Sequence, residues 1–283
     1  MLNIYEFNQY RDFDSFSNLE LFIIAFACLC VGSFAQSVIY RSNPKILNKN
    51  KLNIFYPRSF CPNCKNQINP LYLIPLFGFL FQVGKCIRCR EKISIEYPLA
   101  EISFLLIGLL LVYSYGLNLF FYVTFLIFFL FYILFFLDLK FFYLPFGLNI
   151  SLIITGLATN GFYNMFVDSF FNLLNDNGLL FSLYGFFFGF FTLWSVNFFY
   201  RSMRKKDGIG GGDFILFGAI GSIFGPVSLS FILLVSSLIG CIFFIINKEA
   251  FDNRLPFGSF LILGSIIYFM SKNFELLDKF LVL

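Results

Sequence analysis

Apolar runs long enough to cross a lipid bilayer recur along the chain, and they limit the fold more than any other sequence feature. A transmembrane helix needs about 20 consecutive apolar residues. Of the 283 residues, 59% are hydrophobic and 13% are charged. A soluble protein of this composition would have too few polar residues to cover its surface. We therefore predict an all-α polytopic membrane protein, embedded in lipid, with about eight transmembrane helices. The expected spans lie near residues 19–39, 99–116, 119–137, 144–163, 179–200, 213–225, 227–246 and 257–271.

Lys and Arg are distributed unevenly over the loops that join these spans. With eight spans, the loops 41–98, 138–143, 201–212 and 247–256 share one side of the membrane, and they hold 17 of the 20 basic residues. Loops rich in Lys and Arg stay in the cytoplasm. We therefore expect these four loops inside and both termini outside. The same bias accounts for the basic residues, so nucleic acid is not an expected partner.

Residues 41–98 form the one sizeable segment predicted outside the membrane. A segment of this size buries little hydrophobic core, so it needs a disulfide or a bound metal to stabilise it. The cysteine pairs Cys61/Cys64 and Cys86/Cys89 have the spacing of a structural zinc site. Disulfides are the weaker interpretation in a reducing cytoplasm, and unmetallated thiols are the other alternative. The predicted divisions are 1–40 with the first span, 41–98 with the four cysteines, and 99–283 with the remaining spans.

Histidine is absent from the chain. This excludes Ser-His and Cys-His nucleophilic sites and zinc sites of the HExxH type. Hydrolytic chemistry must then use carboxylates, a Ser-Lys pair or a cysteine-bound metal. Four cysteines on one metal leave no position for a water molecule, so we do not expect a catalytic zinc.

Three acidic residues lie at the ends of predicted spans, where a charge is costly and a function is the default hypothesis. Asp138 ends the third span, Asp213 opens the sixth, and Glu101 lies just inside the second, all at the cytoplasmic side. Simpler explanations exist, because Asp138 can pair with Lys140 and Asp213 can be a first-turn acid of a helix. They leave unexplained the glycines before Asp213, which would let an extended peptide approach the backbone. These are Gly210, Gly211 and Gly212.

Two carboxylates held close together cannot both ionise cheaply, so they share a proton. The ionised one can take a proton from water as a general base, while the protonated one polarises a scissile carbonyl. Such a site needs neither histidine nor metal. Nothing in the sequence indicates whether Asp138 or Asp213 starts protonated.

The motifs along almost the whole chain resemble those of type IV prepilin peptidases, the bifunctional leader peptidases and N-methyltransferases of bacterial pilus and type II secretion systems. They include an opening element, a four-cysteine loop, a GxGD element and a late PFG element. The segments are Gly32–Arg41, Cys61–Cys64, Ile74–Pro75, Gly84–Cys89, Tyr97–Glu101, Gly210–Asp213 and Leu255–Gly258.

This resemblance implies that Asp138 and Asp213 are the catalytic aspartates of a GxGD membrane protease in the bacterial inner membrane. It implies cleavage of prepilins or pseudopilins after a leader glycine, on the cytoplasmic side. It also implies methylation of the new N-terminus with S-adenosylmethionine, although no methyltransferase fingerprint locates that cofactor. Four positions depart from the family pattern and bear on the tuning of the site and on methyl transfer: Gln36, Phe146, Ile215 and Ser259, the last standing where the family has proline.

Other functions remain open from the sequence. A different GxGD protease or an archaeal-type preflagellin peptidase would use the same acids, although the latter usually lacks the cysteine loop. A transporter would use buried acids to carry protons or cations and should show inverted repeats or broken helices at the midplane. A secretion scaffold would use the cysteine loop for docking.

Overall fold

The computed structural model describes residues 16–44, 56, 58–168, 171, 177–246 and 255–273. Within these ranges the regular structure is helical, and two isolated β-bridges, Phe60–Gln67 and Lys85–Lys92, lie beside the two cysteine pairs. The chain forms two compact units, one that ends at Ile133 and one that continues from Leu134. The division at 40 and 98 expected from the sequence stays a prediction.

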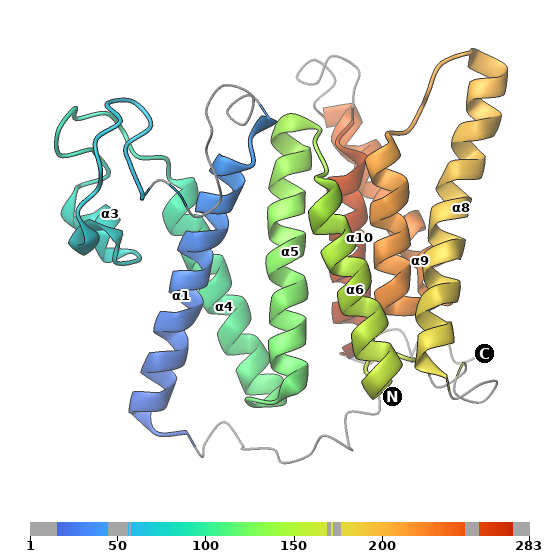
Figure 1. The fold of residues 1–283 in the computed structure, drawn as a ribbon, viewed down its shortest axis with the longest axis horizontal. Helices are drawn as coiled ribbons and strands as arrows, with labels where there is room; N and C mark the ends of the chain where they lie inside the picture. Colours follow the sequence, from blue (N-terminus) through green and yellow to red (C-terminus); the bar gives the residue numbers. More distant parts are fainter. Residues whose placement is uncertain are drawn as a thin grey trace. The chain divides into compact units, whose positions relative to one another are not determined.

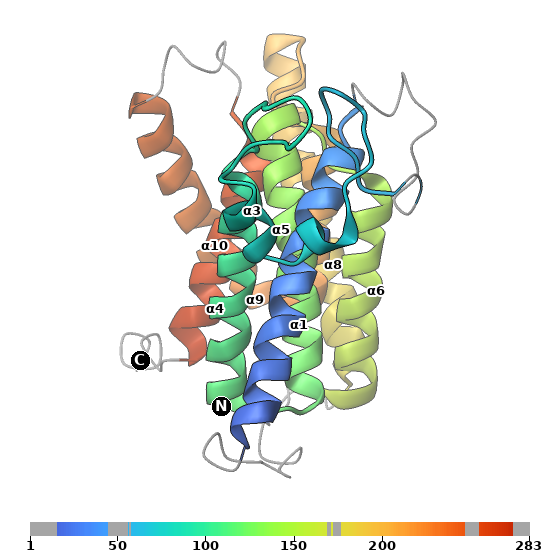
Figure 2. The same cartoon turned by 90° about the vertical axis from the view of Figure 1, so that its left-hand side faces the viewer.

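The first unit contains the helices α1 (Asn18–Arg41) and α4 (Glu96–Tyr115) and most of α5 (Leu119–Phe141). A capping box starts α1, because Ser17 and Glu20 each accept a hydrogen bond from the other's backbone N–H. Figure 2 shows α1 and α4 running side by side. They approach closely at Gly32, where a Cβ atom would lie 2.8 Å from Glu101 Cα.

Aromatic packing joins α4 to α5 in this unit. The fully buried ring of Phe104 contacts four rings of α5, with centroids 5.0–6.1 Å away. Aromatic pairs at this separation add to the free energy of burial. The four rings belong to Phe125, Phe128, Phe129 and Tyr132.

The second unit contains α6 (Phe146–Tyr163), α8 (Gly178–Arg204), α9 (Gly211–Ile246) and α10 (Phe257–Asn273) (Figure 1). Small residues let these helices touch along their backbones. A Cβ atom on Gly189 of α8 would lie 2.6 Å from the carbonyl oxygen of Phe217 on α9. Such close approach is typical of helix pairs in membranes, where van der Waals packing, and not the hydrophobic effect, holds helices together.

The helix α9 consists of two parts. A straight helix of its 36 residues would be about 54 Å long, well beyond the roughly 30 Å of a bilayer core. Gly225 breaks it with a φ of 80°, and Pro226 follows without a backbone N–H to continue the ladder. Leu229 then folds back to within 3.2 Å of the Cβ position of Gly221. The two parts match the predicted sixth and seventh spans.

Five of the described helices are long and apolar enough to cross a membrane, namely α1, α4, α5, α8 and α9. The apolar helix α10 is shorter. The prediction of an all-helical, multi-pass membrane protein is therefore confirmed. The expected loop 247–256 and the turn around 172–178 lie largely outside the described residues, as do both termini.

Candidate active site

Four helix ends meet at one end of the second unit. They are the C-terminal end of α5 and the N-terminal ends of α6, α9 and α10. Leu144, two residues before α6, joins them: its side chain lies 3.0 Å from the Cβ position of Gly212 and 2.9 Å from that of Gly258. Sequence positions 138, 213 and 258 are thereby brought to one place.

The two predicted catalytic aspartates face each other across Gly258. A Cβ atom on Gly258 would lie 3.1 Å from Asp138 Oδ2 and 3.1 Å from Asp213 Oδ1. The two oxygens are therefore separated by no more than twice that distance. Any larger residue at position 258 would put its side chain between them, so glycine keeps the space between the carboxyl groups open.

Ser259 holds the Asp138 carboxyl group from α10. Its backbone N–H and its hydroxyl donate to the same Asp138 oxygen, Oδ2, at 2.7 and 2.9 Å. The hydroxyl also lies 3.0 Å from the carbonyl oxygen of Phe135, so one proton serves two acceptors. Asp138 itself is only 5% exposed. Donors aimed at a buried carboxyl group favour its ionised form.

Asp213 has an unequal environment at its two oxygens. Oδ2 accepts a hydrogen bond from the backbone N–H of Gly210 at 3.2 Å, as a first-turn acid does. The role of a first-turn acid therefore accounts for this oxygen. Oδ1, which faces Asp138 across Gly258, is buried; the backbone N–H of Gly258 is near it, but no donor in the described part of the chain meets it in good hydrogen-bond geometry. Helix capping leaves this second oxygen unexplained, and buried polar atoms of this kind are rare enough to need a cause.

The three glycines before Asp213 differ in their surroundings. A Cβ atom on Gly210 would lie 3.2 Å from Asp213 Oδ2, and one on Gly212 would meet Leu144. At Gly211 nothing lies within 4 Å, so the backbone there borders open space next to the carboxyl pair.

The four cysteines of the first unit come together as predicted. Their sulfur atoms lie within 4.8 Å of one another, and the Cys61 and Cys89 sulfurs are 3.8 Å apart. A tetrahedral zinc site with Zn–S bonds of about 2.3 Å has sulfur–sulfur edges of about 3.8 Å. The donor set therefore fits a four-coordinate structural metal.

Each cysteine pair lies in its own small hairpin, and the two hairpins have the same form. The N–H of Lys65 donates to the carbonyl of Cys61 at 2.9 Å, and that of Arg90 donates to Cys86 at 2.9 Å. Lys65 and Arg90 adopt matching left-handed φ values of 56° and 58°. Backbone N–H groups of Cys89 and Arg88 lower the pKa of the Cys86 thiol to about 6, while desolvation and hydrogen bonds to the other thiols raise the pKa of Cys89 to about 11. Metal binding requires the deprotonated form of each thiol.

Comparison with known proteins gives relatives that cover most of the chain. Residues 26–115 match the bacterial peptidase A24 N-terminal domain, and residues 124–245 match the type IV leader peptidase family. The prepilin leader peptidase/N-methyltransferase of Legionella pneumophila is 33% identical over 87% of this chain and 89% of its own length. The protein of that name from Vibrio cholerae is 33% identical over 89% and 96%. The one from Pseudomonas aeruginosa is 30% identical over 84% and 86%. No solved structure matches the chain.

The chain belongs to the type IV leader peptidase family. In this leader peptidase both aspartates lie in the segment 124–245 that matches the family, Asp138 near its start and Asp213 in its second half. All the motif segments from which the resemblance was inferred lie in the described residues.

Glu101, the third acid singled out from the sequence, belongs to the first unit of this leader peptidase. It is 5% exposed, and its Oε2 accepts a hydrogen bond from the backbone N–H of Leu76 at 2.7 Å. Leu76 has a φ of 62°, which is strained for a leucine. Glu101 therefore fastens a strained turn of the cysteine segment to α4.

Sequence reasoning missed two residues of this end of the leader peptidase. Ser259 was noted only as a departure from the family pattern, although serine adds two donors that proline cannot supply. Asn149, on α6, is completely buried, and both its amide atoms lack hydrogen-bond partners among the described residues. An asparagine inside the apolar run 144–163 was the available signal.

Proposed function

We propose that this chain is a prepilin leader peptidase. It would be a membrane aspartic endopeptidase that cleaves the leader of type IV prepilins or pseudopilins at the cytoplasmic face. The observation that carries the proposal is that an Asp138 oxygen and an Asp213 oxygen lie at equal distances from the Cβ position of Gly258. The names of the relatives supply the substrate class.

The environments of the two carboxyl groups suggest their roles. Asp138 receives two donors from Ser259, so it is the ionised partner and the general base. Asp213 carries the shared proton, because its Oδ1 is buried opposite Asp138 and makes no hydrogen bond of good geometry within the described residues, whereas Asp138 has two donors. Two carboxyl groups this close cannot both ionise cheaply, which keeps one proton between them.

Cleavage then follows from these two states. Asp138 takes a proton from a water molecule, whose oxygen adds to the scissile carbonyl carbon. Asp213 donates its proton to the carbonyl oxygen and neutralises the developing charge. When the tetrahedral intermediate collapses, the C–N bond breaks and the leaving amine takes the proton held by Asp138. Asp213 recovers its proton from the intermediate's hydroxyl group, so the pair returns to its starting state.

The position of the pair suits a substrate that is half in the membrane. Asp138 lies one turn before the end of α5, and Asp213 lies in the first turn of α9. A prepilin with its hydrophobic helix in the bilayer and a short basic leader in the cytoplasm would place its scissile bond at this depth. The open space at Gly211 offers the extended leader a route beside the carboxyl groups.

The distribution of Lys and Arg supports the orientation of the protein. We infer that the end of the second unit carrying Asp138 and Asp213 faces the cytoplasm of a bacterial inner membrane, with both termini outside. The division into 1–40, a cytoplasmic cysteine domain at 41–98 and a protease domain at 99–283 belongs to the same proposal.

Two cofactors belong to the proposal as well. Zinc would be held by Cys61, Cys64, Cys86 and Cys89 and would fasten the cysteine segment, since four thiolates complete a tetrahedral shell. S-adenosylmethionine would supply the methyl group for the new N-terminus, as the names of the relatives suggest.

The experiment is cleavage of a purified prepilin, followed by its shift in gel mobility. Asp138→Ala and Asp213→Ala should each leave the precursor uncut while the protein remains in the membrane fraction. Asp207→Ala is the matched control, because Asp207 lies in the loop before α9 but is exposed and pairs only with Arg201 and Asn197 in the described contacts. Cleavage by either dyad variant at the rate of the control would refute the assignment.

A further inference from the structure

Asn149 is an amide that the fold leaves unused. Its side chain is fully buried, and neither its oxygen nor its nitrogen has a hydrogen-bond partner within the described residues. In the described part of the second unit, the buried side-chain atoms without a partner belong to Asn149 and Asp213 alone. The proposed catalytic acid and this asparagine therefore share an uncommon property.

Asn149 also lies at the depth of the carboxyl pair. It is the fourth residue of α6, one turn from the helix start, as Asp213 is the third residue of α9. Both helices start where Leu144 meets Gly212 and run in the same direction.

The register of α6 turns Asn149 toward α9. Gly156, two turns further along α6, lies against Ser222 of α9, with 2.6 Å between the Ser222 hydroxyl and its Cβ position. Residues seven apart share one face of a helix. Between the contact at Leu144 and the contact at Gly156, Asn149 falls level with the turn of α9 that follows Asp213.

An unpaired buried amide is a cost to the folded protein. It loses its hydrogen bonds to water and gains none in return, whereas an apolar side chain of the same shape would lose nothing. A partner that binds later would compensate this cost. It offers one acceptor and two donors, which match the N–H and the C=O of an extended peptide backbone.

We propose that Asn149 binds the backbone of the substrate peptide beside the scissile bond. Its nitrogen donates to a peptide carbonyl, and its oxygen accepts a peptide N–H. The inference rests on the proposed peptidase function. Since the amide is covered in the structure, the entering peptide parts the contact between α6 and α9 at this end, next to the open space at Gly211.

The test is Asn149→Leu in the full-length protein, assayed for cleavage of a purified prepilin and for thermal unfolding in detergent. Leucine has a similar volume and no polar atoms. The melting temperature should rise by a few degrees, because the unpaired amide is gone. The KM for the prepilin should rise about tenfold, with kcat changed less than about threefold, since two backbone hydrogen bonds are lost.

Asn160→Leu is the matched control, because Asn160 lies on the same face of the same helix but has all its partners inside the fold. Its melting temperature should fall, and its KM should be unchanged in the protein that stays folded.

Three results would overturn the inference while wild-type cleavage upholds the proposed function. They are a fall in the melting temperature of Asn149→Leu, an unchanged KM, and a loss confined to kcat. A wild-type protein that leaves prepilin uncut would instead refute the proposed function itself.

Discussion

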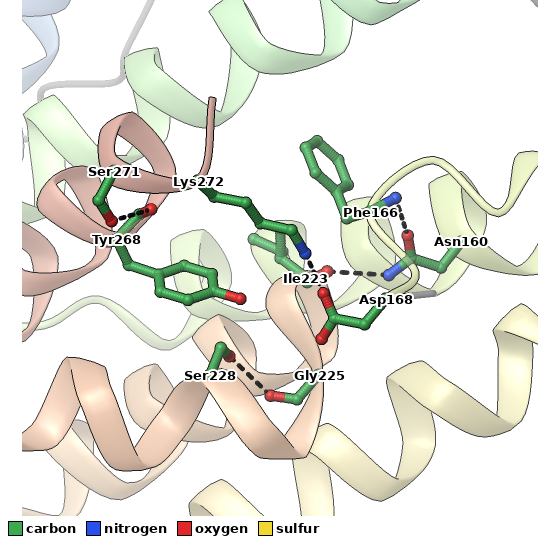
Figure 3. A network of polar contacts seen from close by, with 9 residues as sticks. All are labelled: Asn160, Phe166, Asp168, Ile223, Gly225, Ser228, Tyr268, Ser271 and Lys272. Carbon is green, nitrogen blue, oxygen red and sulfur yellow. Dashed lines mark hydrogen bonds and ion pairs between the residues drawn. The ribbon is translucent and has the colours of Figure 1, made fainter. Parts of the chain in front are cut away.

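Two asparagines on one face of α6 are both fully buried, yet their surroundings are opposite. Asn160 donates to the Ser182 hydroxyl at 2.9 Å and to the carbonyl oxygens of Ser222 and Ile223 at 3.1 and 3.0 Å. Its own oxygen accepts the N–H of Phe166 at 2.9 Å (Figure 3). Asn149, at the other end of the helix, has no such partner among the described residues.

The difference extends to the two ends of the second unit. At the Asn160 end, the amide donates hydrogen bonds to carbonyl groups beside the break in α9 at Gly225. Asp168 forms an ion pair with Lys272 close by (Figure 3). At the Asp138 end, unpaired polar atoms remain on Asp213 and Asn149. A satisfied polar cluster makes the fold rigid, whereas unsatisfied buried groups need a cause, which we assign here to substrate binding. Substitutions should therefore cost stability at the first end and activity at the second.

The largest effect should come from Asp138→Asn or Asp213→Asn. Each should lower kcat/KM for prepilin cleavage by about a thousandfold or more, because an amide cannot exchange the shared proton. The melting temperature should stay within a few degrees of that of the wild type. Cleavage kinetics and thermal unfolding of the same preparation check both parts. Activity within tenfold of the wild type would show that cleavage does not depend on the carboxyl pair at the Asp138 end.

Asn160→Ala should have the largest effect on stability. It removes a donor from three acceptors and an acceptor from Phe166 N–H, and buried groups left without partners cost about 1–3 kcal/mol each. We expect a loss of about 3 kcal/mol or more in the free energy of unfolding. Equilibrium unfolding in mixed detergent measures it. A loss below about 1 kcal/mol would mean that these hydrogen bonds do not hold the break in α9.

Ser259→Ala should have a smaller effect, and this effect should be on activity. It removes the hydroxyl donor to Asp138 but keeps the backbone donor, so kcat should fall about tenfold while KM stays constant. Ser259→Thr, which retains the hydroxyl, should restore the rate. A fall of equal size in the threonine variant would show that position 259 acts through packing instead.

Lys272→Met should have the smallest effect. The pair with Asp168 is partly exposed, with side-chain exposures of 22% and 18%, so salt and water weaken it. We expect a loss of about 1 kcal/mol or less in the free energy of unfolding and no change in cleavage. A measurable loss of activity would connect the Asn160 end to the chemistry and contradict the separation of the two ends.

The helices and the carboxyl pair could be predicted from the sequence because each depends on a local signal. Apolar runs indicate spans directly, and an acid at the end of a span is costly enough to single out Asp138 and Asp213. The cysteine spacing likewise indicates one tetrahedral site. The structure brings each of these sets together as predicted.

The remaining features depend on contacts between distant segments. Ser259 lies 121 positions from Asp138 in the sequence, and only the packing of α10 against α5 makes it a donor. Glu101 was singled out as an ionisable group, but its partner is a strained backbone N–H that no sequence pattern specifies. Asn149 and Asn160 look alike in the sequence, and their difference exists only in three dimensions.

The most direct test of the account is the N-terminus of a prepilin co-expressed with this chain, determined by mass spectrometry. With the wild-type chain, we predict a mature pilin that starts immediately after its leader glycine, with the mass of one methyl group added. With Asp213→Asn, we predict the intact precursor. A mature N-terminus in cells that carry the Asp213→Asn chain as their only such enzyme would contradict the claim that Asp138 and Asp213 together cut the peptide bond.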